Sequence, residues 1–166
     1  WFRKDEARQF LPANPKKGEQ HAVPSKLIQR LARFHFTDTV RAFADVYPQR
    51  CVKEAKLTAT IVEVTGQVVT VRFEGKVVTS QDDARSFGRL PRKPKRGFDA
   101  KLLGHAKFDL KQKRFVAFDL VAFGANRGGG ARSFFEDPVK MGVILELAKD
   151  GPANQVEPNH FSGYNW

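Results

Sequence analysis

Four residues have side chains that could carry out acid–base chemistry: His35, Asp38, His105 and Asp119. A histidine titrates near neutral pH, and a carboxylate such as that of Asp38 can fix its tautomer, so these residues define a hydrolase-like hypothesis. The sequence indicates no nucleophile beside them. We therefore favour the alternative in which His35 packs in the fold and Asp38 forms a turn.

Asp119 is a carboxylate within residues 115–123, a run that is otherwise apolar. A strand that is apolar on both faces is typical of the centre of a layered core, so we expect Asp119 to be buried. A buried carboxylate has to gain hydrogen-bond donors or a cation. An ion pair with Arg33, Arg72 or His105 is the structural alternative to a reactive acid or a ligand pocket, and the one we favour.

The chain has an excess of positive charge, with 29 Lys and Arg against 18 Asp and Glu, a net charge of +11. Such a charge favours binding to polyanions, although it also serves solubility alone. Residues 81–97 form a long polar connection that contains no acid after Asp83. Its cations are the candidate polyanion-binding residues, unless the segment is only a solvated loop. These are Arg85, Arg89, Arg92, Lys93, Lys95 and Arg96.

A second candidate is the glycine-rich stretch 124–132, in which backbone amides and two arginines could bind an anion. It matches neither the Walker A pattern nor the dinucleotide-binding fingerprint, so a flexible loop is the simpler interpretation. The candidate ligand-binding residues are Arg33, Arg41, Arg127 and Arg132. The histidines are scattered and no pair has the spacing of metal ligands, so we predict no metal and no cofactor.

The candidate residues must be positioned by secondary-structure elements. From Lys53 to Ala148 apolar and polar residues alternate with a period of two, which is typical of β-strands. Residues 56–65 and 68–74 form the clearest predicted hairpin, and residues 98–108 and 114–124 form a second one. Residues 139–148 are a last strand. The fold class is therefore mainly β, a single antiparallel barrel or sandwich of five to seven strands with a short N-terminal helix, and we favour the barrel because closure removes exposed edges.

The chain of 166 residues fits a single domain. We expect an extended N-terminal arm over residues 1–24, a β-rich domain over 25–149 and a C-terminal aromatic tail over 150–166. A short helix is expected to begin near Ser25, which is followed by apolar residues at helical spacing. No stretch is long and apolar enough to span a membrane, and Cys51, the single cysteine, cannot form an intramolecular disulfide.

Three stretches, residues 30–38, 118–124 and 141–147, resemble an uncharacterised family of exported bacterial proteins. The resemblance implies an extracytoplasmic location, periplasmic or secreted, and it implies no activity and no catalytic residues. Our leading hypothesis from the residues is a non-enzymatic binding module, with an anionic ligand or polyanion as the candidate partner. The alternatives are the hydrolase-like enzyme and a structural interaction domain of a larger polypeptide; the sequence leaves the oligomeric state open.

Overall fold

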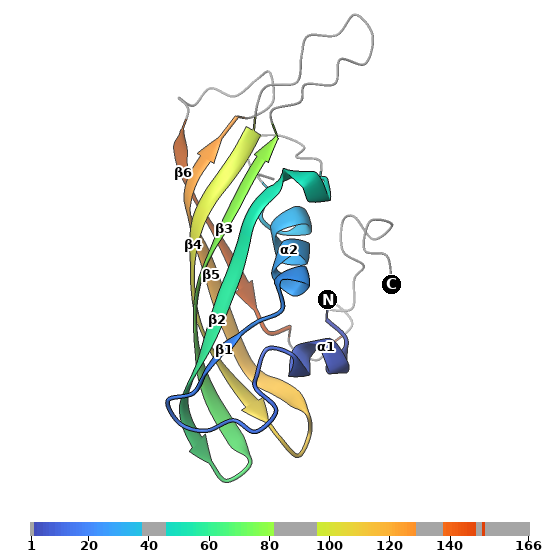
Figure 1. The fold of residues 1–166 in the computed structure, drawn as a ribbon, viewed down its shortest axis with the longest axis vertical. Helices are drawn as coiled ribbons and strands as arrows, with labels where there is room; N and C mark the ends of the chain where they lie inside the picture. The colour runs from blue at the N-terminus through green and yellow to red at the C-terminus, as the bar shows by residue number, and fades with distance from the viewer. Residues whose placement is uncertain (1, 38–45, 82–95, 129–137, 149–150, 152–166) are drawn as a thin grey trace, which may run out of the picture.

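The computed structural model describes residues 2–37, 46–81, 96–128, 138–148 and 151. Within these ranges the chain forms one antiparallel sheet of six strands with helices on one face (Figure 1). The strands are β1 (Gln20–Ala22), β2 (Val52–Thr65), β3 (Val68–Gln81), β4 (Arg96–Asp109), β5 (Arg114–Arg127) and β6 (Val139–Glu146). The helices are α1 (Lys4–Arg8), α2 (Ser25–Phe34) and the 3-10 turn η1 (Gln49–Cys51). The prediction of a mainly β fold with a short N-terminal helix is confirmed.

The strands lie in the sheet in the order in which they occur along the chain, so each strand pairs with the next one. Both predicted hairpins are present, and the residue pairs Thr65–Val68 and Asp109–Arg114 close them. The first turn contains Gly66 at φ 58°, a left-handed conformation that glycine adopts without steric cost.

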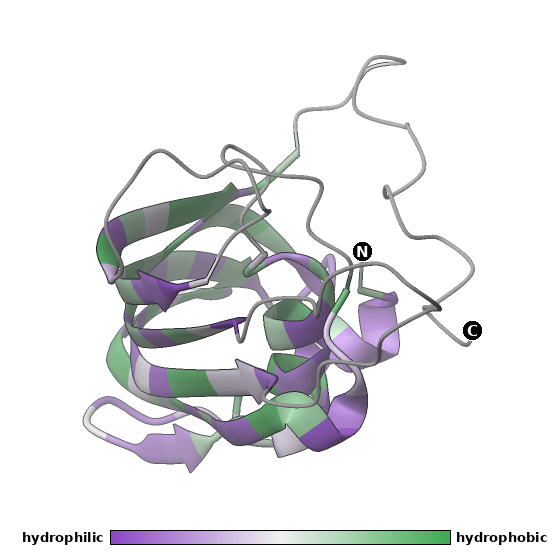
Figure 2. Cartoon of the chain, turned by 90° about the horizontal axis from the view of Figure 1, so that it is seen from above, coloured by the Kyte–Doolittle hydropathy of each residue, from purple (hydrophilic) through white to green (hydrophobic). Residues whose placement is uncertain are grey.

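The prediction of a closed barrel is wrong, because the sheet is open. Among the described strands, β1 and β6 are the two ends of the sheet and do not pair with each other. The sheet curves instead around α2, which lies on its concave face, as Figure 2 shows from above. The helix therefore occupies the space that side chains would fill in a closed barrel. No helix in the described ranges is long and apolar enough to cross a membrane.

The core lies between the concave face and the helices. Leu27, Ile28 and Leu31 of α2 are buried, and the helix packs mainly over β2 and β3. Residues 1–24, expected as an extended arm, contribute to the same core: Phe10 is 1% exposed and its ring meets that of Phe73 edge-on at 6.1 Å. β1 lies in this segment and pairs with β2, so the N-terminal part of the chain belongs to the sheet.

Three glycines on the concave face allow the strands to approach one another closely. A Cβ atom at Gly75, Gly104 or Gly124 would collide with the backbone carbonyl oxygen of a neighbouring strand, that of Lys56, Asp119 and Asp99 respectively. Both ladders of β3 pass Gly75 without a change of register. These glycines mark close backbone approach in the curved sheet.

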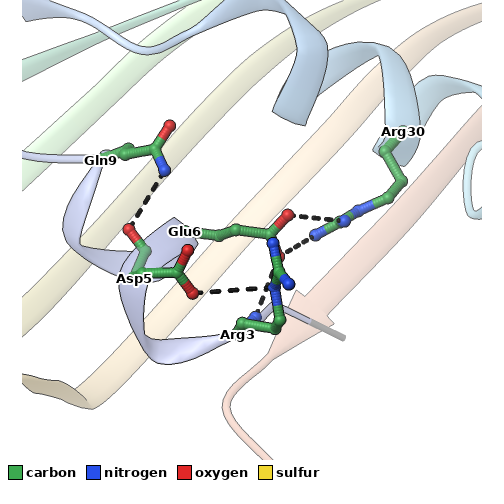
Figure 3. A network of polar contacts seen from close by, with 5 residues as sticks. All are labelled: Arg3, Asp5, Glu6, Gln9 and Arg30. Carbon is green, nitrogen blue, oxygen red and sulfur yellow. Dashed lines mark hydrogen bonds and ion pairs between the residues drawn. The ribbon is translucent and has the colours of Figure 1, made fainter. Parts of the chain in front are cut away.

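A charged pair joins the two helices on the concave side (Figure 3). The guanidinium of Arg30 donates two hydrogen bonds to the carboxylate of Glu6, at 3.0 Å and 2.8 Å, and lies 4.4 Å from the ring centre of Phe2. The backbone amide of Arg3 donates a further bond to Glu6 at 2.9 Å. The side chains of Arg30 and Glu6 are only 15% and 11% exposed. The pair therefore fixes α1 against α2.

Candidate functional site

The three residues of the hydrolase-like hypothesis that the structure describes, His35, His105 and Asp119, do not meet in one site. His35 follows the last turn of α2, where its backbone amide bonds to the carbonyl of Leu31. Burial lowers the pKa of His35 to about 4, with a smaller contribution from the charge of Arg30, so its ring is neutral at pH 7. His105 and Asp119 lie on the opposite, convex face of the sheet. Asp38 lies outside the described residues.

The expectation that Asp119 is buried is wrong, because its side chain is exposed on the convex face. None of the described helices covers this face, and the apolar residues that share it are exposed as well: Val121 is 38% exposed and Phe123 is 54% exposed. β5 is the fifth of six strands and is not the centre of a layered core. The apolar residues around Asp119 therefore do not indicate that this face of β5 is buried.

The convex face does bring two of the candidates together. His105 of β4 lies opposite Asp119 of β5, and the row continues to Arg72 on β3 and Glu146 on β6. Neighbouring side chains in such a row have Cβ atoms about 5 Å apart. A shallow hollow of about 290 Å³ lies along this row, beside Leu103. Its lining residues are Arg72, Phe73, Leu103, Gly104, His105, Asp119 and Val121.

This hollow has two charged side chains, those of Arg72 and Asp119, and one imidazole, that of His105. None of its lining residues is a serine, threonine, cysteine or lysine. Within the described ranges, no group of three or more His, Cys, Asp or Glu side chains is arranged to hold a metal ion.

Arg33, proposed for ligand binding, and Arg96, proposed for polyanion binding, hold the fold together. The Nε atom of Arg33 donates to the carbonyl of Tyr47 at 3.0 Å. Arg96 donates to Gln81 at 2.8 Å and to the carbonyl of Val46 at 3.1 Å, and its guanidinium lies 4.4 Å from the ring centre of Tyr47. Both arginines therefore anchor the segment around Tyr47.

Of the remaining arginines and lysines proposed for anion binding, only Arg127 is described, and it is exposed at the end of β5. The other candidates lie outside the described residues. These are Arg41, Arg85, Arg89, Arg92, Lys93, Lys95 and Arg132.

The structure reveals a cationic surface that the sequence reasoning missed. It lies where the β2–β3 and β4–β5 turns meet, at the lower end of the sheet in Figure 1. The two turns are joined by a hydrogen bond from the amide of Leu110 to the carbonyl of Gln67, at 2.8 Å. We define this hairpin end as residues 14–19, 62–70 and 107–114, which hold six Lys and Arg against three acids. The sequence signal was the short run of cations at 107–114.

The β4–β5 turn is organised by polar contacts that leave its lysines exposed. Gln112 donates from its backbone amide and its side chain to the two carboxylate oxygens of Asp109, at 2.8 Å and 3.1 Å. Arg114 donates to the side-chain oxygen of Gln112 at 2.8 Å. Lys111 and Lys113 are exposed and form no ion pair with any described residue.

Lys113 has a backbone conformation that is unfavourable for its residue type. Its φ of 54° is left-handed, and among the described residues it is the only non-glycine with a positive φ. A lysine in this region costs about 1 kcal/mol relative to glycine. A left-handed residue is a regular part of many β-hairpin loops, and Lys113 is the last loop residue before β5.

Comparison of the chain with protein-family models, with curated proteins and with solved structures finds no match.

Proposed function

We propose that this protein is a non-enzymatic binding module whose partner is a linear polyanion carrying phosphate or sulfate groups. The observation that carries the proposal is the group of exposed lysines on and beside the β4–β5 turn, Lys107, Lys111 and Lys113. The net charge of +11 supports it, because a field of this sign raises the rate of encounter with polyanions.

The charges of the hairpin end come from two separate parts of the chain. Lys107 is exposed on β4, two residues before this strand ends at Asp109 and the turn with Lys111 and Lys113 begins. Lys16 and Lys17 precede β1, and the next residue, Gly18, is held to β2 by a hydrogen bond from its amide to the carbonyl of Ile61 at 2.8 Å. Cations on both segments can contact successive anionic groups of an extended ligand.

The acids of the hairpin end offset only half of its positive charge, since three carboxylates accompany six Lys and Arg. Asp109 uses both carboxylate oxygens within the turn. Glu19 accepts a hydrogen bond from the backbone amide of Lys16 at 3.0 Å. Each of these two carboxylates is therefore engaged locally, and Glu63 on β2 is the third acid. The lysine ammonium groups remain available to a ligand.

Neutralising three lysines tests the proposal. We expect the triple variant Lys107→Gln, Lys111→Gln, Lys113→Gln to bind duplex DNA more weakly than the wild type. The variant should also elute from heparin at a lower salt concentration. Each phosphate contact contributes about 0.9 to the slope of log K against log salt, so the slope should fall by about 2 to 3. Fluorescence anisotropy across a salt series measures it, and a thermal melt confirms that the variant is folded.

A matched control separates a local site from net charge. Lys4→Gln, Lys26→Gln and Lys101→Gln remove the same charge from exposed positions outside the hairpin end. If the salt dependence of binding falls equally in this control, the affinity depends on net charge alone and not on a site at the hairpin end. A loss confined to Arg89→Gln, Arg92→Gln and Lys93→Gln would place binding on residues 81–97 instead, and absence of binding by the wild type would refute the function.

Lys113→Gly should separate stability from binding. Glycine adopts φ 54° without strain, but it also gains freedom in the unfolded chain, so the free energy of unfolding should rise by no more than about 0.5 kcal/mol. The affinity for heparin should fall as it does when Lys113 alone is replaced by Gln. Urea unfolding and heparin elution measure the two effects. A less stable Lys113→Gly protein would mean that the lysine side chain has a structural role.

A further inference from the structure

The outer edge of strand β6 carries backbone groups that its ladder with β5 does not use. Within the described residues, no strand pairs with β6 on the side away from β5, whereas the opposite edge is the three-residue strand β1. β6 contains neither a proline nor a bulge, and its ladder with β5 has no change of register. It therefore has few of the features that protect edge strands from pairing with another chain.

The hydrogen bonds to β5 identify the backbone groups that face outward. The amide of Leu147 donates to the carbonyl of Phe118 at 2.9 Å, in continuation of the β5–β6 register. Bonding positions alternate along an antiparallel strand, so Leu145, Val143 and Met141 also face β5. The amides and carbonyls of the intervening residues point to the open edge. These are Lys140, Gly142, Ile144 and Glu146.

We propose that β6 pairs antiparallel with β6 of a second copy of this chain, about a two-fold axis at Val143. Residues directly opposite each other must lie on the same face of the joined sheet, which limits the axis to a residue position. With the axis at Val143, Lys140 lies opposite Glu146 of the second copy, and this pair occurs twice. An axis at Gly142 or Ile144 leaves both charges without a partner across the axis.

The charges of the strand fit this register. Lys140 and Glu146 are the only charged residues of β6, they are exposed on the convex face, and they have opposite signs. Opposite charges facing each other across two strands stabilise pairing, whereas like charges there oppose it. The strand is therefore complementary to itself in charge despite the high positive charge of the whole chain.

The convex face fits the same register. Leu103, Phe123 and Ile144 are 60%, 54% and 64% exposed, an apolar patch that ends at the β6 edge. Gly142 lies beside Phe123 and leaves space there, since a Cβ atom on it would be 3.6 Å from the nearest ring atom. Ile144 of the second copy lies opposite Gly142, so the two patches join into one strip. The proposal is independent of polyanion binding.

Charge reversal tests the pairing and its register. Sedimentation of the wild type at about 0.15 M salt, where repulsion between the copies is screened, should show a concentration-dependent rise toward twice the chain mass of 18.7 kDa. Lys140→Glu places like charges opposite each other and should weaken self-association by about tenfold or more. The double variant Lys140→Glu, Glu146→Lys should restore it, which an unspecific effect of either substitution would not.

A cysteine at the axis gives a second readout. Val143→Cys places two thiols on a non-hydrogen-bonded pair with Cα atoms about 4.5 Å apart, close enough for a disulfide on oxidation by oxidised glutathione. Met141→Cys is the control, because the two copies of this residue lie several positions apart; Cys51 is buried. A wild type that stays monomeric, a double variant that does not recover, or crosslinking at Met141→Cys but not at Val143→Cys would overturn the proposal.

Discussion

Gly124→Ala is expected to lower the free energy of unfolding by about 3 kcal/mol or more, because the new methyl group has no space. It would collide with the carbonyl oxygen of Asp99 and lie 2.7 Å from the Cα atom of Ala100. Both atoms belong to the backbone of β4, which is held in register by β3 and β5, so they cannot move independently. Urea unfolding followed by circular dichroism measures the loss.

Gly142→Ala is the matched control for this prediction. It lies in β6, where the nearest atom to a new Cβ is a ring carbon of Phe123 at an ordinary contact distance of 3.6 Å. Alanine is favoured over glycine in a strand interior by about 0.5 to 1 kcal/mol, so this variant should be as stable as the wild type or slightly more stable. Equal effects of the two substitutions would contradict the close approach of β4 and β5 at Gly124.

Glu6→Gln is expected to lower the free energy of unfolding by about 3 kcal/mol at pH 7. The substitution leaves the guanidinium of Arg30 largely buried without its carboxylate. The hydrogen bonds from Arg30 lower the pKa of Glu6 below its ordinary value, and this effect exceeds the opposite effect of burial. A carboxylate with a lowered pKa stabilises the fold above its unfolded-state pKa, and the contribution is lost as the pH falls through the lowered value.

The pH dependence gives this prediction its check. The difference in stability between the wild type and Glu6→Gln should be largest near neutral pH and should shrink below the ordinary carboxyl pKa of 4.5. Asp5→Asn is the control on the same helix, because Asp5 is 69% exposed and its ion pair with Arg3 spans 3.7 Å. This control should change stability by less than about 0.5 kcal/mol. A pH-independent effect of Glu6→Gln would exclude the ion pair as its cause.

The strands of this protein were predictable because alternation of apolar and polar residues is a local signal. β2, β4 and β5 begin or end within a few residues of the predicted bounds. β1 was not predicted, since three residues are too few to show a period. Whether the sheet closes into a barrel could not be predicted from the sequence either. It depends on which face of the sheet α2 covers and on backbone contacts at glycines such as Gly124.

The candidate site was predicted only in part. The sequence indicated His105 and Asp119, and register places them side by side, but the apolar neighbours of Asp119 suggested a burial that the uncovered convex face does not provide. The left-handed φ of Lys113 is a property of the backbone, so the residue pattern did not predict it. The extracytoplasmic location and the binding role of residues 81–97 stay predictions.

Lysine footprinting tests the central claim most directly. The protein is acetylated with and without saturating heparin, and mass spectrometry gives the protection of each lysine. Binding at the hairpin end predicts strong protection of Lys107, Lys111 and Lys113, with Lys4 and Lys26 modified equally in both conditions. Uniform protection of all exposed lysines, or protection confined to Lys93 and Lys95, would contradict it.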